Sequence, residues 1–347
     1  MFRKIFGKKP DKRVHISGTD VEFEVGRNQT ILEAALAQKL SFPHDCTVGT
    51  CGSCRAKLLS GKVDAITPFG YTLSREELQA GYILACQAVP ETDVELAVEM
   101  DPDVEVRTVK GRIVETRDLT HDIKQVTWAV DQPVDYVAGQ YMNVRWPDAP
   151  GHRSYSFSAA PVAGGATRLS TFIRKVPGGA FTEKLFGGAL DDADFTIEGP
   201  HGHFWLREGN GPILLVGGGS GLSPLMSLLE DALAKGVARD AILLFGGRAE
   251  CDLYCLDEIA AIGARWKGRF EFWPVLSEEQ GEGRRFGMVT AEIPGAISAL
   301  GGVSGLQAYM CGPPPMIDAA VRDLTGVGVS LDDIHYDKFT DASSAGK

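Results

Sequence analysis

Four cysteines near the start of the chain have the spacing that a metal cluster requires. Cys46, Cys51 and Cys54 form the run C-x4-C-x2-C, and Cys86 follows after a longer insertion. This is the spacing of a plant-type [2Fe–2S] site, in which four thiolates hold two irons. The glycines of the loop permit turns that other residues disfavour, and its amides are able to point at the sulfurs. The four thiolates therefore predict a centre that carries one electron at a time.

A glycine run in the second half of the chain predicts a site for a phosphate group. The apolar residues 213–216 are expected to form a strand that ends in Gly217, Gly218, Gly219, Ser220 and Gly221, before a helix over residues 223–233. Backbone amides at such a turn approach a pyrophosphate, although a plain strand-to-helix turn fits the run equally well. A later strand of the same sheet ends in Cys311, Gly312 and Pro313. Because ligands of open α/β sheets bind at the carboxyl ends of strands, we expect both motifs to border one crevice.

A third group of residues lies in a predicted strand at residues 153–158. Arg153 and Tyr155 point to one side of this strand and Ser156 to the other. An arginine binds a phosphate through two N–H groups, a tyrosine offers its face to a planar ring, and a serine hydroxyl reaches a ring nitrogen. An ordinary polar strand is the alternative. Downstream, Gly179 and Thr182 precede a predicted helix and form a second candidate phosphate seat.

The elements that must position these residues divide the chain into three predicted domains. After a basic tail at residues 1–12, residues 13–100 alternate as short strands around one helix at residues 30–39, which Thr30 and Glu33 cap. This pattern predicts a β-grasp domain that holds the cysteine loop. Residues 104–207 contain short strands separated by turn residues, which predicts an antiparallel six-stranded β-barrel. Residues 210–347 alternate apolar strands with helices, which predicts a parallel α/β sheet covered on both faces.

Composition narrows the class of protein. The 347 residues carry a net charge of −11, whereas a nucleic-acid-binding protein needs a basic face. The acidic charge serves either solubility or docking to a partner protein. Seven cysteines are too few for a disulfide scaffold, and the sequence lacks a long apolar run, so we expect a cytoplasmic protein without a spanning helix. The basic tail is either a solvated end or a weak contact with the anionic inner face of a membrane.

Together these motifs resemble those of the ferredoxin–NAD(P)H reductase superfamily, in the branch of oxygenase reductases with an N-terminal ferredoxin domain. They follow the order of that family from about residue 13 to 340. The resemblance implies that Arg153 contacts the phosphates of FAD, that Tyr155 stacks on the isoalloxazine ring and that Ser156 lies near its reactive nitrogen. It also implies that Gly179 and Thr182 hold the FAD pyrophosphate.

The same resemblance assigns the nicotinamide nucleotide to the second half of the chain. Residues 217–221 are expected to bind it, and Cys311, followed by Gly312 and Pro313, is expected beside the nicotinamide ring. Phe339 is expected either at the flavin face or in the core.

The preferred nucleotide is predicted from a short charged stretch. Arg248 is followed by Glu250 and Asp252, and one arginine beside two acids is a poor pocket for a 2′-phosphate. We therefore expect NADH rather than NADPH, with Glu250 or Asp252 accepting a hydrogen bond from a ribose hydroxyl.

The implied activity is electron transfer from NADH through FAD and the [2Fe–2S] cluster to an oxygenase component. Flavin stands between the other two because it takes up an electron pair and releases electrons singly. The oxygenase is either a diiron monooxygenase, soluble or membrane-bound, or a Rieske dioxygenase; residues 42–46 and 253–258 resemble reductases of the membrane-bound kind. Two other functions stay open. One is a reductase for a deoxysugar dehydratase or another [2Fe–2S] acceptor, and the other is a redox sensor that binds cofactors without turnover.

Overall fold

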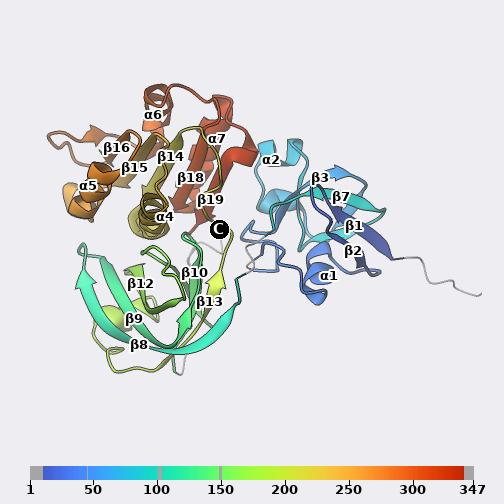
Figure 1. The fold of residues 1–347 in the computed structure, drawn as a ribbon, viewed down its shortest axis with the longest axis horizontal. Helices are drawn as coiled ribbons and strands as arrows, with labels where there is room; N and C mark the ends of the chain where they lie inside the picture. The colour runs from blue at the N-terminus through green and yellow to red at the C-terminus, as the bar shows by residue number, and fades with distance from the viewer. Residues whose placement is uncertain (1–10, 45, 101–103, 148–150, 340–347) are drawn as a thin grey trace, which may run out of the picture. The chain divides into compact units, whose positions relative to one another are not determined.

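The chain folds as two units, residues 1–103 and residues 104–347 (Figure 1). The computed structural model describes residues 11–44, 46–100, 104–147 and 151–339. Residues 1–10 of the basic tail, expected to be either a solvated end or a weak membrane contact, lie outside the described residues. Among the helices of the described ranges, none is long and apolar enough to cross a membrane.

The first unit is built on a mixed five-stranded sheet in the order β2-β1-β7-β3-β5. Its strands are β1 (Lys12–Ile16), β2 (Glu22–Val25), β3 (Arg55–Ser60), β5 (Tyr82–Leu84) and β7 (Val94–Ala97). Strands β1 and β7 pair in parallel and the other neighbours pair antiparallel. A two-stranded sheet of β4 (Val63–Ala65) and β6 (Ala88–Pro90), the 3-10 turn η1 (Phe69–Tyr71) and the helices α1 (Ile31–Ala37) and α2 (Arg75–Gln79) complete the unit. The predicted small mixed sheet over a capped helix at α1 is confirmed, and α2 is a second, short helix that was not predicted from the sequence.

The capping box predicted for α1 is present. The Thr30 side chain accepts a hydrogen bond from the Glu33 amide at 3.1 Å, and the Glu33 carboxylate accepts from the Thr30 amide at 2.9 Å. The helix ends at Ala37, earlier than the expected end at Lys39. The reason is that Lys39 adopts a φ of 60°, in the left-handed region that terminates helices.

The second unit begins with an antiparallel sheet in the order β11-β10-β13-β8-β9-β12. Its six strands are β8 (Arg107–Asp118), β9 (Ile123–Val134), β10 (Tyr141–Arg145), β11 (Arg153–Ser156), β12 (Ala166–Arg174) and β13 (Phe195–His201), with the short helix α3 (Thr182–Phe186) between the last two. An antiparallel bridge between Phe157 and Thr171 joins the end of β11 to β12. Because these two strands are the edges of the sheet, the bridge closes it, and the predicted six-stranded barrel is confirmed.

The rest of the second unit is a parallel sheet in the order β17-β16-β15-β14-β18-β19. Its strands are β14 (Ile213–Gly218), β15 (Ala241–Gly247), β16 (Phe270–Leu276), β17 (Arg285–Phe286), β18 (Gln307–Gly312) and β19 (Ile334–Lys338). Its helices are α4 (Leu222–Ala234), α5 (Leu256–Arg265), α6 (Ile293–Ala299) and α7 (Pro314–Gly326), with 3-10 turns η2 (Gly219–Gly221), η3 (Glu250–Asp252), η4 (Val289–Glu292) and η5 (Leu331–Asp333).

Two hydrophobic clusters cover the two faces of this parallel sheet. Leu215 and Leu243 pack with α4 and α5, whereas their neighbours Leu214 and Ile242 pack with α6 and α7. Successive strand residues point to opposite faces, so a strand buried on both sides is apolar throughout. This is why the continuous apolar runs correctly predicted a doubly covered sheet.

Candidate cofactor sites

The backbone of the cysteine loop wraps around its own sulfurs. Cys46 Sγ accepts from the amides of Thr50 at 3.3 Å and Cys51 at 3.4 Å, and Cys51 Sγ accepts from the Ser53 amide at 3.4 Å. These turns need glycine: a β-carbon added at Gly49, whose φ is +84°, would stand 2.7 Å from a carbon of the Gln87 side chain. The loop therefore points several N–H donors at sulfur.

Strand pairing brings the fourth cysteine to the loop. Strands β3 and β5 pair antiparallel, and the Ala85 amide donates to the Cys54 carbonyl at 3.0 Å. As a result the Cys86 amide donates to Cys54 Sγ at 3.4 Å. Cys54 and Cys86 are buried, whereas Cys46 and Cys51 are partly exposed.

The four thiols interact electrostatically in two neighbouring pairs. A hydrogen bond from the Cys51 thiol lowers the pKa of Cys46 to about 4, and a hydrogen bond from the Cys54 thiol lowers the pKa of Cys86. The pKa of Cys54 is raised in turn by its bond to Cys86. The charge of Cys46 raises the pKa of Cys86 in the opposite direction, with a smaller effect. Sulfurs that share protons in pairs, surrounded by amide donors, fit a group that binds four thiolates.

The candidate flavin strand β11 lies beside β10, with Arg153 opposite Val144 and Ser156 opposite Tyr141. Arg153 is exposed; its guanidinium donates to the His152 carbonyl at 2.8 Å and lies 5.6 Å from the ring centre of Trp146. An exposed guanidinium with one backbone partner has N–H groups left for a phosphate.

The other two residues of the flavin motif are more buried. Tyr155 packs against Phe181 with ring centres 5.5 Å apart, and burial raises the pKa of its phenol. Ser156 is only 5% exposed. The three residues thus lie within the four positions of strand β11, as expected.

The second candidate phosphate seat is a tight turn around Val176. The Thr182 hydroxyl accepts from the Val176 amide at 3.0 Å and donates to the Val176 carbonyl at 3.2 Å. A β-carbon at Gly179 would stand 2.6 Å from that hydroxyl, so the turn requires glycine there. The adjacent Gly178 amide donates to Glu183 at 3.2 Å. In this structure Thr182 therefore shapes the turn through its own backbone contacts.

The two glycine motifs of the parallel sheet lie side by side. Strands β14 and β18 pair so that Gly217 stands opposite Cys311. A β-carbon at Gly221 would stand 2.1 Å from the Cys311 carbonyl oxygen, and one at Gly312 would stand 3.3 Å from the Gly218 oxygen. A bulkier residue at Gly221 would separate the loops, so the packing explains why glycines fill this stretch. The two motifs therefore lie at one edge of the sheet, as expected, and a nucleotide crevice at this edge stays a prediction.

Tyr254, which is buried, and Phe339, which is partly buried, hydrogen-bond to these loops. The Tyr254 hydroxyl donates to the Gly219 carbonyl at 2.9 Å, and the Phe339 amide donates to the Gly312 carbonyl at 2.9 Å. The Phe339 side chain packs against the hydrophobic cluster that contains Cys311. Cys311 itself is fully buried, and burial raises the pKa of its thiol well above the usual range.

The charged stretch after β15 forms two ion pairs. One oxygen of Asp252 accepts from the Arg248 amide at 2.8 Å and from its Nε at 3.3 Å. Glu250 accepts from Arg284, from Nε at 3.0 Å and Nη2 at 2.6 Å. Sequence reasoning missed Arg284, because it is 34 positions away from Glu250 and no local pattern links the two.

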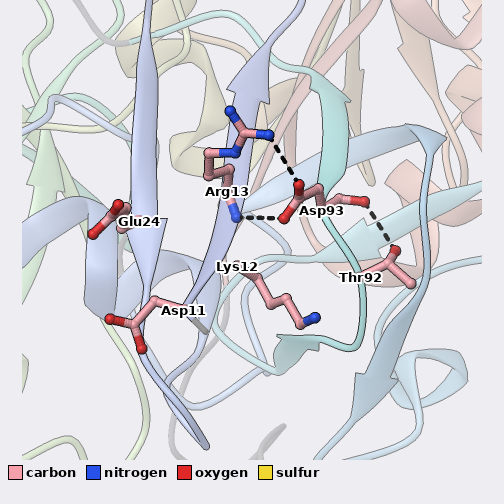
Figure 2. Close-up of a pocket in the computed structure, with 6 residues that line it drawn as sticks. All are labelled: Asp11, Lys12, Arg13, Glu24, Thr92 and Asp93. Atoms are coloured by element: carbon pink, nitrogen blue, oxygen red, sulfur yellow. Dashed lines mark hydrogen bonds and ion pairs between the residues drawn. The ribbon is translucent and has the colours of Figure 1, made fainter. Parts of the chain in front are cut away.

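A shallow hollow of about 470 Å³ lies at the edge of the first sheet (Figure 2). Figure 2 shows Arg13 donating to Asp93 within it, from the amide at 3.0 Å and from Nη2 at 3.3 Å. Its lining comes from β1, β2 and the turn before β7, namely Asp11, Lys12, Arg13, Glu24, Thr92 and Asp93. These residues lie outside the predicted ligand sets, and we assign the hollow no cofactor.

Comparison with known families assigns each segment of the chain. Residues 14–91 match the 2Fe-2S iron-sulfur cluster binding domain, residues 110–205 the oxidoreductase FAD-binding domain, and residues 215–322 the oxidoreductase NAD-binding domain. The three matches follow one another in the order of the three sheets.

Similar proteins cover nearly the whole chain. The xylene/toluene monooxygenase electron transfer component of Pseudomonas putida is 40% identical over 97% of this chain and 97% of its own length. The crystal structure of an Amycolatopsis cytochrome P450 reductase is 34% identical, with a TM-score of 0.71 over 95% of this chain and 99% of that one. A ferredoxin reductase in carbazole 1,9a-dioxygenase is 27% identical, with a TM-score of 0.66 and the same coverage.

Proposed function

The chain belongs to the family of iron–sulfur flavoprotein reductases that supply oxygenase components, and on this premise we propose that its electron acceptor is the hydroxylase component of a monooxygenase. Members of this family transfer electrons from NADH through FAD and a [2Fe–2S] cluster to the oxygenase. The 40% identity to a xylene/toluene monooxygenase component over almost the full length supports a monooxygenase as the partner.

The convergence of four cysteine sulfurs, three from one loop and one from a neighbouring strand end, is the observation that carries the proposed electron route through a [2Fe–2S] cluster. Cys46, Cys51, Cys54 and Cys86 come from a loop and a neighbouring strand end. The sulfurs of the first three accept backbone N–H bonds, and Cys86 Sγ accepts from the Gln87 side-chain amide at 3.8 Å. We assign these four as the cluster ligands. These four cysteines distinguish the chain from flavin reductases that transfer electrons without an iron centre.

The second unit supplies the binding residues for the two nucleotides. We propose that Arg153 neutralises the FAD phosphates, that Tyr155 and Ser156 orient the ring, and that Gly179 and Thr182 shape the turn at the pyrophosphate. We assign the nicotinamide nucleotide to residues 217–221, with Arg248, Cys311, Gly312 and Pro313 at the same edge of the sheet. We propose that the Phe339 side chain lies near the face of the flavin ring. When bound, FAD accepts a hydride from NADH and releases electrons singly, which is what a one-electron cluster requires.

We also propose limits for the three domains: residues 13–100 for the cluster, 104–207 for FAD and 210–347 for the nucleotide. The order of the three sheets along the chain supports them. A location in the cytoplasm, where NADH is available and thiolates stay reduced, is consistent with this assignment.

Anaerobic titration with NADH tests the proposal. We expect the absorbance of both flavin and cluster to decrease on addition of NADH, and the reduced protein to support turnover of a purified monooxygenase hydroxylase. Steady NADH-dependent reduction of cytochrome c would distinguish this function from that of a redox sensor, which would stop oxidising NADH once its own cofactors are reduced. A protein that binds FAD and iron but is not reduced by NADH would overturn the proposal, and turnover with a deoxysugar dehydratase instead would reassign the partner.

A further inference from the structure

Helix α4 presents a row of polar side chains to the strand that we assign to flavin. Ser223, Ser227 and Glu230 stand four and three positions apart, which places them on one face of the helix. The rest of that face is apolar, and Ser223 and Ser227 are 1% and 0% exposed. Buried hydroxyls are costly unless they are hydrogen-bonded, so the partners of these two serines explain why they are there.

The partners are backbone groups of residues 156–160, a segment that begins at Ser156, the last residue of the flavin motif. Ser223 Oγ donates to the Ser156 carbonyl at 2.9 Å, and Ser227 Oγ donates to the Ala159 carbonyl at 2.6 Å. Glu230 accepts from the Ala160 amide at 2.9 Å. Three residues on successive turns of α4 thus hold three backbone groups of residues 156–160.

Further bonds complete the attachment. Ser223 Oγ also accepts from the Phe172 amide of β12 at 3.3 Å. From the barrel side, the Tyr136 hydroxyl donates to the carbonyls of Ala159 and Ala160 at 3.1 and 3.0 Å. Residues 156–160 are therefore held between the barrel and the helix.

Apolar packing alone would not fix this register. The hydrophobic cluster around α4 already includes barrel residues such as Phe172 and Ala138. Such contacts are non-directional, whereas hydrogen bonds to carbonyl oxygens define where the strand lies along the helix.

The same helix begins at the candidate nicotinamide site. Its first residue, Leu222, directly follows Gly221, which packs on the Cys311 carbonyl. One helix thus connects the loop proposed for the nicotinamide nucleotide with the strand proposed for the flavin. Transfer between two rings depends steeply on their spacing, and a displacement of about 1 Å costs on the order of a hundredfold in rate.

We propose that Ser223 and Ser227 are positioning residues for hydride transfer: their hydroxyls hold the flavin strand at a set distance from the nicotinamide loop. The inference rests on the proposed function, since it needs the flavin at β11 and the nicotinamide at residues 217–221. It predicts that loss of a hydroxyl slows flavin reduction without removing either cofactor.

The test compares the full-length holoprotein with the variants Ser227→Ala, Ser223→Ala and Ser227→Thr by anaerobic stopped-flow reduction with NADH. We expect the alanine variants to retain FAD and the cluster and to bind NADH with unchanged affinity. The rate constant for flavin reduction by NADH should fall about tenfold. We also expect a changed long-wavelength absorbance, which reports stacking of nicotinamide on flavin. Ser227→Thr keeps a hydroxyl, so its rate of flavin reduction and its long-wavelength absorbance should match those of the unmodified protein. Ser298→Ala, a serine exposed on α6, is the matched control.

Either alanine variant is sufficient if the other fails to fold. Flavin reduction within about twofold of the unmodified protein, with unchanged long-wavelength absorbance in the folded variants, would overturn the inference. Failure of the unmodified protein to accept electrons from NADH would instead overturn the proposed function, so the two failures are distinguishable.

Discussion

Gly221 lies directly against Cys311: a β-carbon at Gly221 would stand 2.1 Å from the Cys311 carbonyl oxygen and 2.5 Å from its carbonyl carbon. The backbone of Gly221 has φ −62° and ψ −12°, which any residue adopts without strain. The glycine is therefore required by space and not by backbone conformation. Its absent side chain allows the ends of β14 and β18 to form one edge.

Replacing Gly221 with alanine should separate the two loops. We expect a loss of about 1–3 kcal/mol in the free energy of unfolding and a raised KM for NADH, because the backbone must move to accommodate the methyl group. Thermal unfolding and NADH-dependent ferricyanide reduction measure the two effects. Gly295→Ala is the control. Gly295 lies in α6, and its added β-carbon would stand 3.8 Å from the Trp273 side chain, an ordinary contact distance. Because alanine favours a helix over glycine, this variant should raise the free energy of unfolding by about 0.5–1 kcal/mol. An unchanged melting temperature for Gly221→Ala would contradict the observed spacing.

Replacing Arg153 with alanine should weaken FAD retention. A charge-assisted contact with a phosphate is worth about 1.5–3 kcal/mol, so the dissociation constant should rise roughly tenfold to a hundredfold. Equilibrium dialysis or flavin fluorescence gives this constant. Arg168→Ala on β12, whose guanidinium pairs with Glu115 at 3.3 Å on an exposed surface, is the control. If FAD affinity were the same in both variants, the flavin would not lie at β11.

Replacing Cys86 with serine should remove the cluster and leave the flavin in place. We expect loss of the visible spectrum of the cluster and of cytochrome c reduction, while ferricyanide reduction is largely retained because ferricyanide accepts electrons from flavin. Cys251→Ser is the matched control, since Cys251 is exposed and outside the loop. Loss of both activities in a folded, FAD-loaded Cys86→Ser protein would disprove the order of electron transfer.

Glu230 should make stability depend on pH. Burial raises the pKa of its carboxyl, with a smaller effect from the charge of Glu258, while the Ala160 amide acts in the opposite direction. A pKa that is higher in the folded protein than in the unfolded chain contributes stability below the unfolded value of 4.5, and this contribution is lost as pH rises through the folded value. Glu230→Gln keeps an acceptor for the Ala160 amide but does not titrate.

The melting temperature of Glu230→Gln relative to the unmodified protein should therefore rise as pH increases from about 4.5 and level off once Glu230 is charged. Differential scanning calorimetry across this range provides the measurement. A relative stability that falls with rising pH would show that the carboxyl is not held in a desolvated position.

Preference for NADH should depend on Glu250. Glu250 neutralises Arg284 and Asp252 neutralises Arg248, so neither cation is free to bind a 2′-phosphate. Glu250→Gln should release the charge of Arg284 and raise kcat/KM for NADPH by about tenfold, the value of one charge-assisted contact. Glu292→Gln, which releases the neighbouring Arg285 from its 2.7 Å pair, serves as the control. If kcat/KM for NADPH were the same in Glu250→Gln and Glu292→Gln, the ribose 2′-hydroxyl of the bound nucleotide would not lie near Glu250.

The sequence alone was sufficient where the determining contacts are local. The spacing of Cys46, Cys51 and Cys54 indicated a cluster loop, because one short loop must carry all three sulfurs. The Thr30–Glu33 capping box and the apolar strands of the parallel sheet were predicted correctly, because each depends on neighbours within a few positions.

Tertiary structure decided which distant groups meet. The Cys86 amide reaches Cys54 only because β3 and β5 pair, Gly221 meets Cys311 only because β14 and β18 are neighbours, and Arg284 reaches Glu250 across 34 positions. In the sequence, nothing distinguishes Ser223 and Ser227 of α4 from other helix residues, and only the tertiary structure shows their hydrogen bonds to residues 156 and 159. The motifs predicted that Cys86 joins the loop and that the two glycine runs share an edge, but the individual contacts follow from how whole elements pack, which no local pattern specifies.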